Sequence, residues 1–140
     1  MDRTLVICKP DAVERGLVGE MIGRLEQKGL RLVAAELRMV DAALAEAHYE
    51  EHQGKSFFGD LVAFITRSPV LVAVVEGPGD TWKVVRTMIG ATNPRDAAPG
   101  TIRGDHGTLT TENLIHGSDG PESAEREIGL WFPRLAGGGL

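Results

Sequence analysis

The sequence predicts a single α/β domain, of the α+β kind, with the element order βαββαβ and a four-stranded antiparallel sheet covered by helices. Short runs rich in β-branched residues alternate with segments whose apolar residues recur every three or four positions. Glycine and proline separate many of these segments. A chain of 140 residues fits one domain with a sizeable core, so we expect residues 1–134 to form it and the glycine-rich residues 135–140 to be a flexible tail.

The first part of the chain predicts a strand, a helix and a second strand. Residues 4–8 form a short apolar run that stops at Pro10, which is typical of a buried strand. The next apolar residues recur at i, i+3, i+4 and i+7 and predict a helix that ends before Gly29. These residues are Val18, Met21, Ile22 and Leu25. Residues 30–40 then read as the second strand, with polar side chains at intervals.

The middle of the chain predicts two helices and a third strand. Asp41 can cap a helix over residues 42–47, and a second apolar stripe predicts another helix over residues 58–65. The apolar run at 70–75 predicts the third strand, which the Gly-Pro-Gly of residues 77–79 ends.

The last part of the chain predicts a helix, a long loop, a short strand and a final helix. The helix ends at Gly90, and residues 91–112 contain three glycines, two prolines and little periodicity. A loop of this length in a compact domain is typically functional or disordered. Residues 114–116 predict the fourth strand, and Pro121 opens the last helix. With the additional helices set aside, this order is the ferredoxin-like βαββαβ pattern.

Charge and composition argue against several functional classes. The formal net charge is −5, whereas domains that bind nucleic acid usually carry a basic face, so we expect no specific nucleic-acid partner. The chain has one cysteine, Cys8, so no internal disulfide forms and a cytoplasmic location is expected. No apolar run approaches the ~18 residues that cross a membrane, so we expect no membrane partner.

Two motifs imitate binding sites. Residues 54–56 read Gly-Lys-Ser, like the end of a phosphate-binding P-loop, but the required earlier glycine is Tyr49 and a helix precedes the motif. His48 and His52 have the i, i+4 spacing of metal ligands, but the zincin order is absent. We interpret these histidines as part of a solvated helix face and predict no metal site in the protein.

His116 is the leading candidate for chemistry. It ends the predicted fourth strand and precedes Gly117, whose small size would let a phosphate approach. A neutral imidazole is a good nucleophile, and Glu127 on the last helix could accept a hydrogen bond from one ring nitrogen and leave the other free. From the residues alone, two interpretations stay open: a nucleophile with its orienting carboxylate, or a turn histidine and a solvent-facing glutamate.

Basic and polar residues offer a cradle for phosphates. A triphosphate needs several donors because its charge spreads over oxygens of more than one phosphate. The candidates are Lys9, Arg86, Thr92, Arg103 and Asn113, each of which alone would be an ordinary surface residue. Phe57 lies off the apolar stripe that includes Phe58, so it is expected to be exposed. It would either stack on a base of any kind or make a hydrophobic contact with another subunit.

With these residues in view, the chain resembles the nucleoside diphosphate kinases over about residues 3–133. The most specific motif is Asn-x-x-His-Gly-Ser-Asp, present at 113–119. Four further blocks match in the same order, at residues 4–11, 57–58, 99–105 and 122–128.

The resemblance implies a ping-pong reaction. A nucleoside triphosphate such as ATP would give its γ-phosphoryl group to His116, and a nucleoside diphosphate would collect it from the phosphohistidine. Mg²⁺ would be carried by the nucleotide phosphates, in keeping with its preference for water and phosphate oxygen. The family forms homo-oligomers from a common dimer, and a hexamer is favoured here over a tetramer because the long loop matches the commoner class.

The resemblance also implies roles for individual residues. Lys9 and Asn113 would bind near the phosphates and the sugar hydroxyls, and Phe57 would stack on the base. Three further residues would hold phosphates, namely Arg86, Thr92 and Arg103. Another three would line or orient His116, namely Tyr49, Ser118 and Glu127.

Four residues depart from the family pattern: Cys8, Ser56, His106 and Gly120. None is a matched phosphate ligand or the candidate nucleophile, so they bear on loop packing and subunit contacts rather than on activity. Two other classes fit the sequence less well than the kinase. A non-catalytic relative is disfavoured because no matched catalytic position is lost, and a nucleic-acid-binding regulator of the same fold is disfavoured by the charge.

Overall fold

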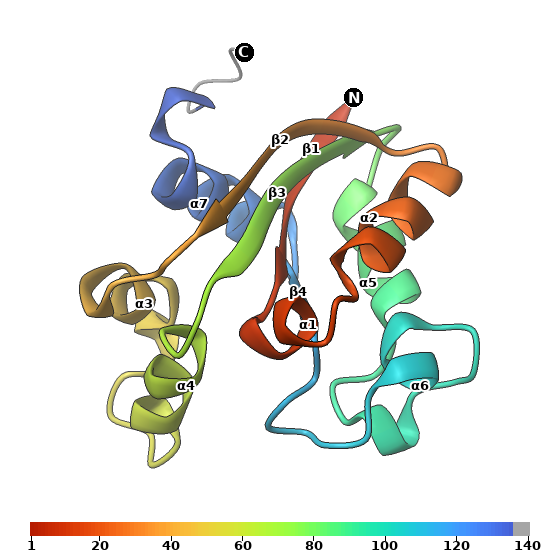
Figure 1. Ribbon diagram of the computed structural model, residues 1–140. Coiled ribbons are helices and arrows are strands. Elements are labelled where there is room, and N and C mark those ends of the chain that lie inside the picture. Colours follow the sequence, from red (N-terminus) through yellow and green to blue (C-terminus); the bar gives the residue numbers. More distant parts are fainter. Residues whose placement is uncertain (136–140) are drawn as a thin grey trace.

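The computed structural model describes residues 1–135, whose strands form one four-stranded sheet (Figure 1). Neighbouring strands are antiparallel and follow the order β2-β3-β1-β4, which is the predicted ferredoxin-like α/β arrangement. The predicted tail lies outside the described residues except for Leu135, which is buried at the end of a 3₁₀-helix. The strands are β1 Asp2–Cys8, β2 Arg31–Arg38, β3 Val70–Gly77 and β4 Ile115–Gly117.

Helices connect and cover these strands. Among the described residues, none of them is long and apolar enough to cross a membrane. The α-helices are α1 Pro10–Glu14, α2 Val18–Gln27, α3 Ala42–His48, α4 Phe58–Ile65, α5 Thr81–Ile89, α6 Ile102–His106 and α7 Pro121–Trp131. The short 3₁₀-helices are η1 Glu50–His52, η2 Pro94–Asp96 and η3 Pro133–Leu135.

The sheet is buried on both faces, which explains the apolar run at residues 5–8 of β1. Leu5 and Ile7 point to a core shared with α3, α4 and α7, whereas Val6 and Cys8 point to a core shared with α1, α2, α5 and α6. Figure 1 shows these two groups of helices on opposite sides of the sheet. Because successive strand residues face opposite sides, a strand between two cores needs apolar residues at every position.

The sequence prediction missed two short helices. Pro10, interpreted only as the end of a strand, is also the first residue of α1, where its missing N–H costs no hydrogen bond. The predicted loop at 91–112 is wrong at α6, where Thr101 caps the helix by accepting a hydrogen bond from Gly104 N at 3.0 Å. Both helices have five residues, too few to show a helical period.

Strand β4 positions the candidate nucleophile at an edge of the sheet. It pairs with β1 so that His116 lies opposite Ile7, on the face covered by α3 and α7. Gly117 faces α5 instead, and a Cβ atom there would come within 2.9 Å of Ile89 Cδ1. The small size of Gly117 therefore serves helix packing, which corrects the prediction that it makes room for a phosphate.

Candidate active site

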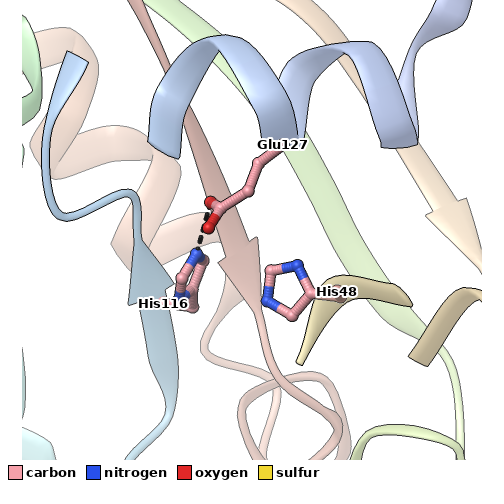
Figure 2. Close-up of side chains that lie close together, drawn as sticks. All are labelled: His48, His116 and Glu127. Atoms are coloured by element: carbon pink, nitrogen blue, oxygen red, sulfur yellow. Dashed lines mark hydrogen bonds and ion pairs between the residues drawn. The ribbon is translucent and has the colours of Figure 1, made fainter. Parts of the chain in front are cut away.

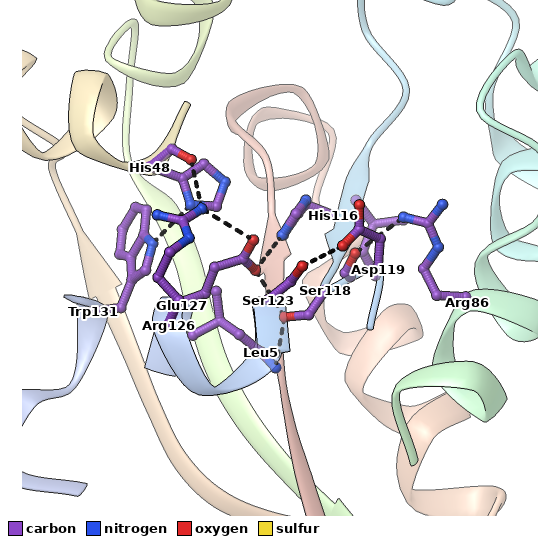
Figure 3. A network of polar contacts seen from close by, with 12 residues as sticks. Leu5, His48, Arg86, His116, Ser118, Asp119, Ser123, Arg126, Glu127 and Trp131 are labelled. Carbon is purple, nitrogen blue, oxygen red and sulfur yellow. Dashed lines mark hydrogen bonds and ion pairs between the residues drawn. The ribbon is translucent and has the colours of Figure 1, made fainter. Parts of the chain in front are cut away.

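His116, Glu127 and Ser118 form a hydrogen-bonded group between β4 and α7. His116 Nε2 lies 2.8 Å from Glu127 Oε1 (Figure 2). The same carboxylate oxygen accepts a hydrogen bond from Ser118 Oγ at 2.7 Å (Figure 3). Leu5 N donates to the same serine oxygen at 3.4 Å and ties the group to β1 (Figure 3). Because an ionised carboxylate only accepts, Nε2 carries a proton, and in the neutral form of the imidazole Nδ1 keeps a lone pair.

Glu127 is buried and ionised, which excludes the solvent-facing alternative. Its side chain is 7 % exposed, against 22 % for His116. Burial raises the pKa of Glu127, but the hydrogen bond and charge of His116 and the hydrogen bond from Ser118 outweigh it and hold the pKa below its ordinary value. The carboxylate is therefore present as the acceptor that orients the imidazole.

His48 is a site residue that the sequence prediction misplaced. Helix α3 ends at His48, and His52 belongs to η1, so the two do not share the predicted solvated helix face. His48 is 3 % exposed, and its ring lies edge-on to that of His116 with the centroids 4.8 Å apart. The available signal was its spacing: it follows Ala45 by three residues and Leu44 by four, and both of these contact the core.

His48 is neutral, and its tautomer is fixed. Trp131 Nε1 donates to His48 Nδ1 at 3.1 Å, so the proton of His48 is on Nε2. Burial, together with the charge of His116, lowers the pKa of His48 to about 3. His48, His116 and Glu127 lie within 4.8 Å of one another, but a protonated Nε2 has no lone pair for a metal. These three residues therefore make a poor metal site.

Tyr49 and Arg126 complete this wall of the site. Burial and the charge of Glu127 raise the pKa of Tyr49 to about 12, so its hydroxyl is a neutral hydrogen-bond donor. Arg126 on α7 donates to the carbonyl oxygens of Ala47 and His48, each at 3.2 Å, and ties the end of α3 to α7 (Figure 3).

An unusual turn leads into β4. Leu114 has a φ of 74°, and Ile115 N donates to Asn113 O at 2.9 Å, which closes a γ-turn around it. Few non-glycine residues adopt positive φ, so the surrounding contacts must hold this turn. The strand consequently begins at Ile115 rather than at residue 114 as predicted.

Lys9, Asn113 and Thr92 are joined by hydrogen bonds at the turn before β4. Lys9 Nζ donates to Asn113 Oδ1 at 2.8 Å, and Asn113 Nδ2 donates to Thr92 O at 3.1 Å. These contacts bring together residues from the end of β1, the segment after α5 and the turn before β4. Burial and the charge of Arg103 lower the pKa of Lys9 to about 8.

Arg103 lies on α6, and its side chain binds the backbone of the turn around Leu114. Its guanidinium donates to Asn113 O at 3.1 Å, Gly90 O at 3.3 Å and Ile115 O at 2.6 Å. A guanidinium has about five N–H donors, so three of them are used and about two remain for a ligand. Burial and the charge of Arg86 lower the pKa of Arg103 to about 10. Cationic side chains whose charges lower one another's pKa create a site for a polyanion.

All but one of the ten predicted site residues line a single cleft of about 670 Å³. Ser118 is the exception because it lies buried behind Glu127. Phe57, at the rim, is 44 % exposed as predicted, while Phe58 packs against the core. The cleft also contains residues that the sequence prediction did not single out as site residues, among them His48, His52, Leu61, Thr110 and Asp119.

Comparison with known proteins shows the family to which the chain is related. A family model described as nucleoside diphosphate kinase matches residues 2–136. A protein named nucleoside diphosphate kinase from Saccharopolyspora erythraea is 63 % identical over 135 residues, which cover 96 % of this chain and 98 % of the relative. One with the same name from Chloroflexus aggregans is 59 % identical over 132 residues, covering 94 % and 87 %.

Solved structures give the same family. The structure of a halophilic nucleoside diphosphate kinase from Halobacterium salinarum in complex with CDP has a TM-score of 0.91 and 51 % identity, and covers 94 % of this chain and 87 % of that one. The nucleoside diphosphate kinase from Encephalitozoon cuniculi has a TM-score of 0.93 and 41 % identity, covering 97 % and 92 %. Together with the matched family model, these relatives identify this chain as a member of the nucleoside diphosphate kinase family, a family of phosphotransferases.

Proposed function

We propose that this chain transfers the γ-phosphoryl group of a nucleoside triphosphate, such as ATP, to a nucleoside diphosphate by a ping-pong reaction through His116. One observation carries the proposal: Glu127 binds Nε2 of His116, which in the neutral imidazole leaves the Nδ1 lone pair free, at a cleft lined by four cationic side chains, Lys9, Arg67, Arg86 and Arg103. The relative crystallised with CDP supports a nucleotide as the ligand.

In the first half-reaction, Nδ1 of His116 attacks the γ-phosphorus while the bond to the nucleoside diphosphate breaks. The imidazole becomes cationic, and Glu127, already bonded to Nε2–H, stabilises that charge. Ser118 holds the carboxylate from behind, and the neutral Tyr49 supplies a hydroxyl at the site wall. The second half-reaction reverses these steps with another nucleoside diphosphate.

The remaining cleft residues hold the nucleotide. Lys9, Arg86 and Arg103 neutralise phosphate oxygens, and Thr92 and Asn113 add neutral donors near the phosphates and the sugar. Phe57 stacks on the base, which gives affinity without base selectivity. Mg²⁺ would enter with the phosphates and neutralise part of their charge, since the protein's own cluster at His116 is rich in imidazole rather than in the oxygen ligands that magnesium prefers.

The test is covalent labelling. With γ-labelled ATP and Mg²⁺ but no acceptor, the wild-type chain should acquire label that is acid-labile and base-stable, and GDP should then remove it as a labelled triphosphate. The His116→Ala variant should acquire none. His106→Ala is the matched control because His106 lies outside the cleft, and it should be labelled normally. Label retained by His116→Ala, or label that GDP cannot remove, would refute the mechanism.

We further propose that the chain acts as a homo-oligomer in the cytoplasm. Strand β2 is an edge of the sheet, and Leu37 and Met39 at its end are 64 % and 62 % exposed. An unpaired strand edge with exposed apolar side chains suits pairing with a second copy of the chain. Light scattering distinguishes the expected hexamer from a tetramer.

A further inference from the structure

Asp11 is a buried carboxylate that the proposed chemistry leaves without a role. It lies in the first turn of α1 and is 3 % exposed. Its Oδ2 accepts a hydrogen bond from Leu114 N at 3.1 Å, across more than a hundred residues of sequence. Its Oδ1 is buried and accepts no hydrogen bond from the residues that the structure describes. Burying a charged group with one oxygen unpaired costs free energy, so a compensating role for Asp11 is expected.

One role of Asp11 is to hold the turn at Leu114. The peptide groups of this residue are held on both sides by the start of α1, because Asp11 accepts from Leu114 N and Lys9 N donates to Leu114 O at 2.8 Å. The positive φ of Leu114 sets the direction in which β4 leaves the turn, and His116 follows two residues later. Asp11 therefore fixes the backbone that presents the nucleophile.

The turn alone does not require a carboxylate. The amide oxygen of an asparagine would accept the hydrogen bond from Leu114 N equally well. What only an ionised aspartate adds is negative charge, and the group nearest to benefit is Lys9, two residues earlier and bonded to Asn113. The charge of Asp11 raises the pKa of Lys9, whereas burial and Arg103 lower it to about 8. Burial raises the pKa of Asp11 itself, and the charge of Lys9 opposes this rise.

We propose that Asp11 is a positioning residue for phosphoryl transfer, with one carboxylate oxygen holding the turn that aims His116 and its negative charge holding Lys9 in the ammonium form that binds phosphates. This inference rests on the proposed function of the cleft. Besides Asp11, the groups whose charges couple to Lys9 are Arg103 on α6 and His48 on α3. Further charged or titratable groups line the same cleft, among them Arg86 on α5, His116 on β4, Glu127 on α7, and Glu112 and Asp119 on either side of β4.

The experiment separates charge from geometry with two variants. Asp11→Asn keeps the acceptor for Leu114 N and loses the charge, so kcat/KM for ATP should decline at a pH about one unit or more below the wild-type decline. The wild-type decline is expected near pH 8, where Lys9 loses its proton. Asp11→Glu keeps the charge but displaces the turn, so kcat should fall at every pH. The alkaline limb, which is the decline of kcat/KM for ATP at high pH, should stay at the wild-type pH.

A non-titrating cation at position 9 provides the control. In the Lys9→Arg variant the alkaline limb should disappear. Adding Asp11→Asn to that variant should leave the pH dependence of kcat/KM unchanged. An unchanged alkaline limb in Asp11→Asn, or the same shift in the Lys9→Arg background, would overturn the inference. If Asp11→Asn does not fold, the Asp11→Glu profile decides instead, and a shifted alkaline limb there would count against the role of the charge.

Labelling with γ-labelled ATP at pH 6.5 separates this inference from the proposed function. There Asp11→Asn should still form the phosphohistidine, because Lys9 remains charged. Absence of label on the wild-type chain would instead refute the proposed function itself.

Discussion

The two walls of the cleft are built differently. The wall from β4 and α7 presents His116 through a chain of short hydrogen bonds, with Ser118 fully buried and the Glu127 side chain 7 % exposed. The wall from η1 and the start of α4 presents Phe57, 44 % exposed, against the ring of His52 at 5.4 Å and the Lys55 ammonium at 5.7 Å.

The difference matches what each wall has to do. A nucleophile must be held close to one orientation, because small displacements of reacting atoms cost large factors in rate. A platform for bases of several kinds needs a flat apolar surface and little else. The first wall is therefore expected to be sensitive to single substitutions and the second to be tolerant, and three predictions test this contrast.

The largest effect is expected at Glu127. Glu127→Ala removes a charge-assisted hydrogen bond worth roughly 1.5–3 kcal/mol, so kcat should fall about 10- to 100-fold. Ser118→Ala, which leaves Glu127 in place, should lower kcat less. Glu125→Ala is the matched control, since that glutamate is exposed on the same helix. Steady-state kinetics at saturating nucleotide measure the change, and an equal loss in the control would show that α7 as a whole was disturbed.

An intermediate effect is expected on stability below neutral pH. His48 has an ordinary pKa of 6.5 when unfolded and about 3 when folded, so below pH 6.5 the unfolded chain binds a proton that the folded chain does not. The free energy of unfolding should therefore decrease by about 1.4 kcal/mol per pH unit from this group as the pH falls toward 3. His48→Gln, which can still accept from Trp131, should lose that component. Urea unfolding between pH 4.5 and 7 measures it, and identical slopes in both proteins would contradict the assignment.

The smallest effect is expected at Phe57. An aromatic–base contact is worth about 1 kcal/mol at its lower limit, so Phe57→Ala should raise KM about five-fold with kcat nearly unchanged. The increase should be similar for purine and pyrimidine nucleotides. Leu109→Ala, an exposed apolar residue that does not line the cleft, is the control. An increase in KM confined to purine nucleotides would show that this wall selects the base rather than binding every base alike.

Much of the fold could be predicted because the apolar residues of its main strands and helices recur at regular spacings. The apolar residues of β1 and the stripe of α2 reflect burial that any such strand or helix requires, and Met21 and Leu25 are buried as expected. The elements that were missed, α1 and α6, are too short for a period and depend on Pro10 and Thr101 at their starts. His48 was misplaced because a histidine reads as polar in sequence, while its burial depends on an indole donor on a distant helix.

The sequence by itself determined the order of the main strands and helices, the family resemblance and the identity of His116 as the candidate nucleophile. Its local patterns suffice for this because burial and helix capping act within a few residues. Only the tertiary structure decided that Glu127 faces inward, that Lys9 and Arg103 meet at one turn, and that Asp11 reaches Leu114. These contacts join residues of different elements, between 10 and 103 positions apart, and electrostatic interactions depend on distance and burial that no local pattern contains.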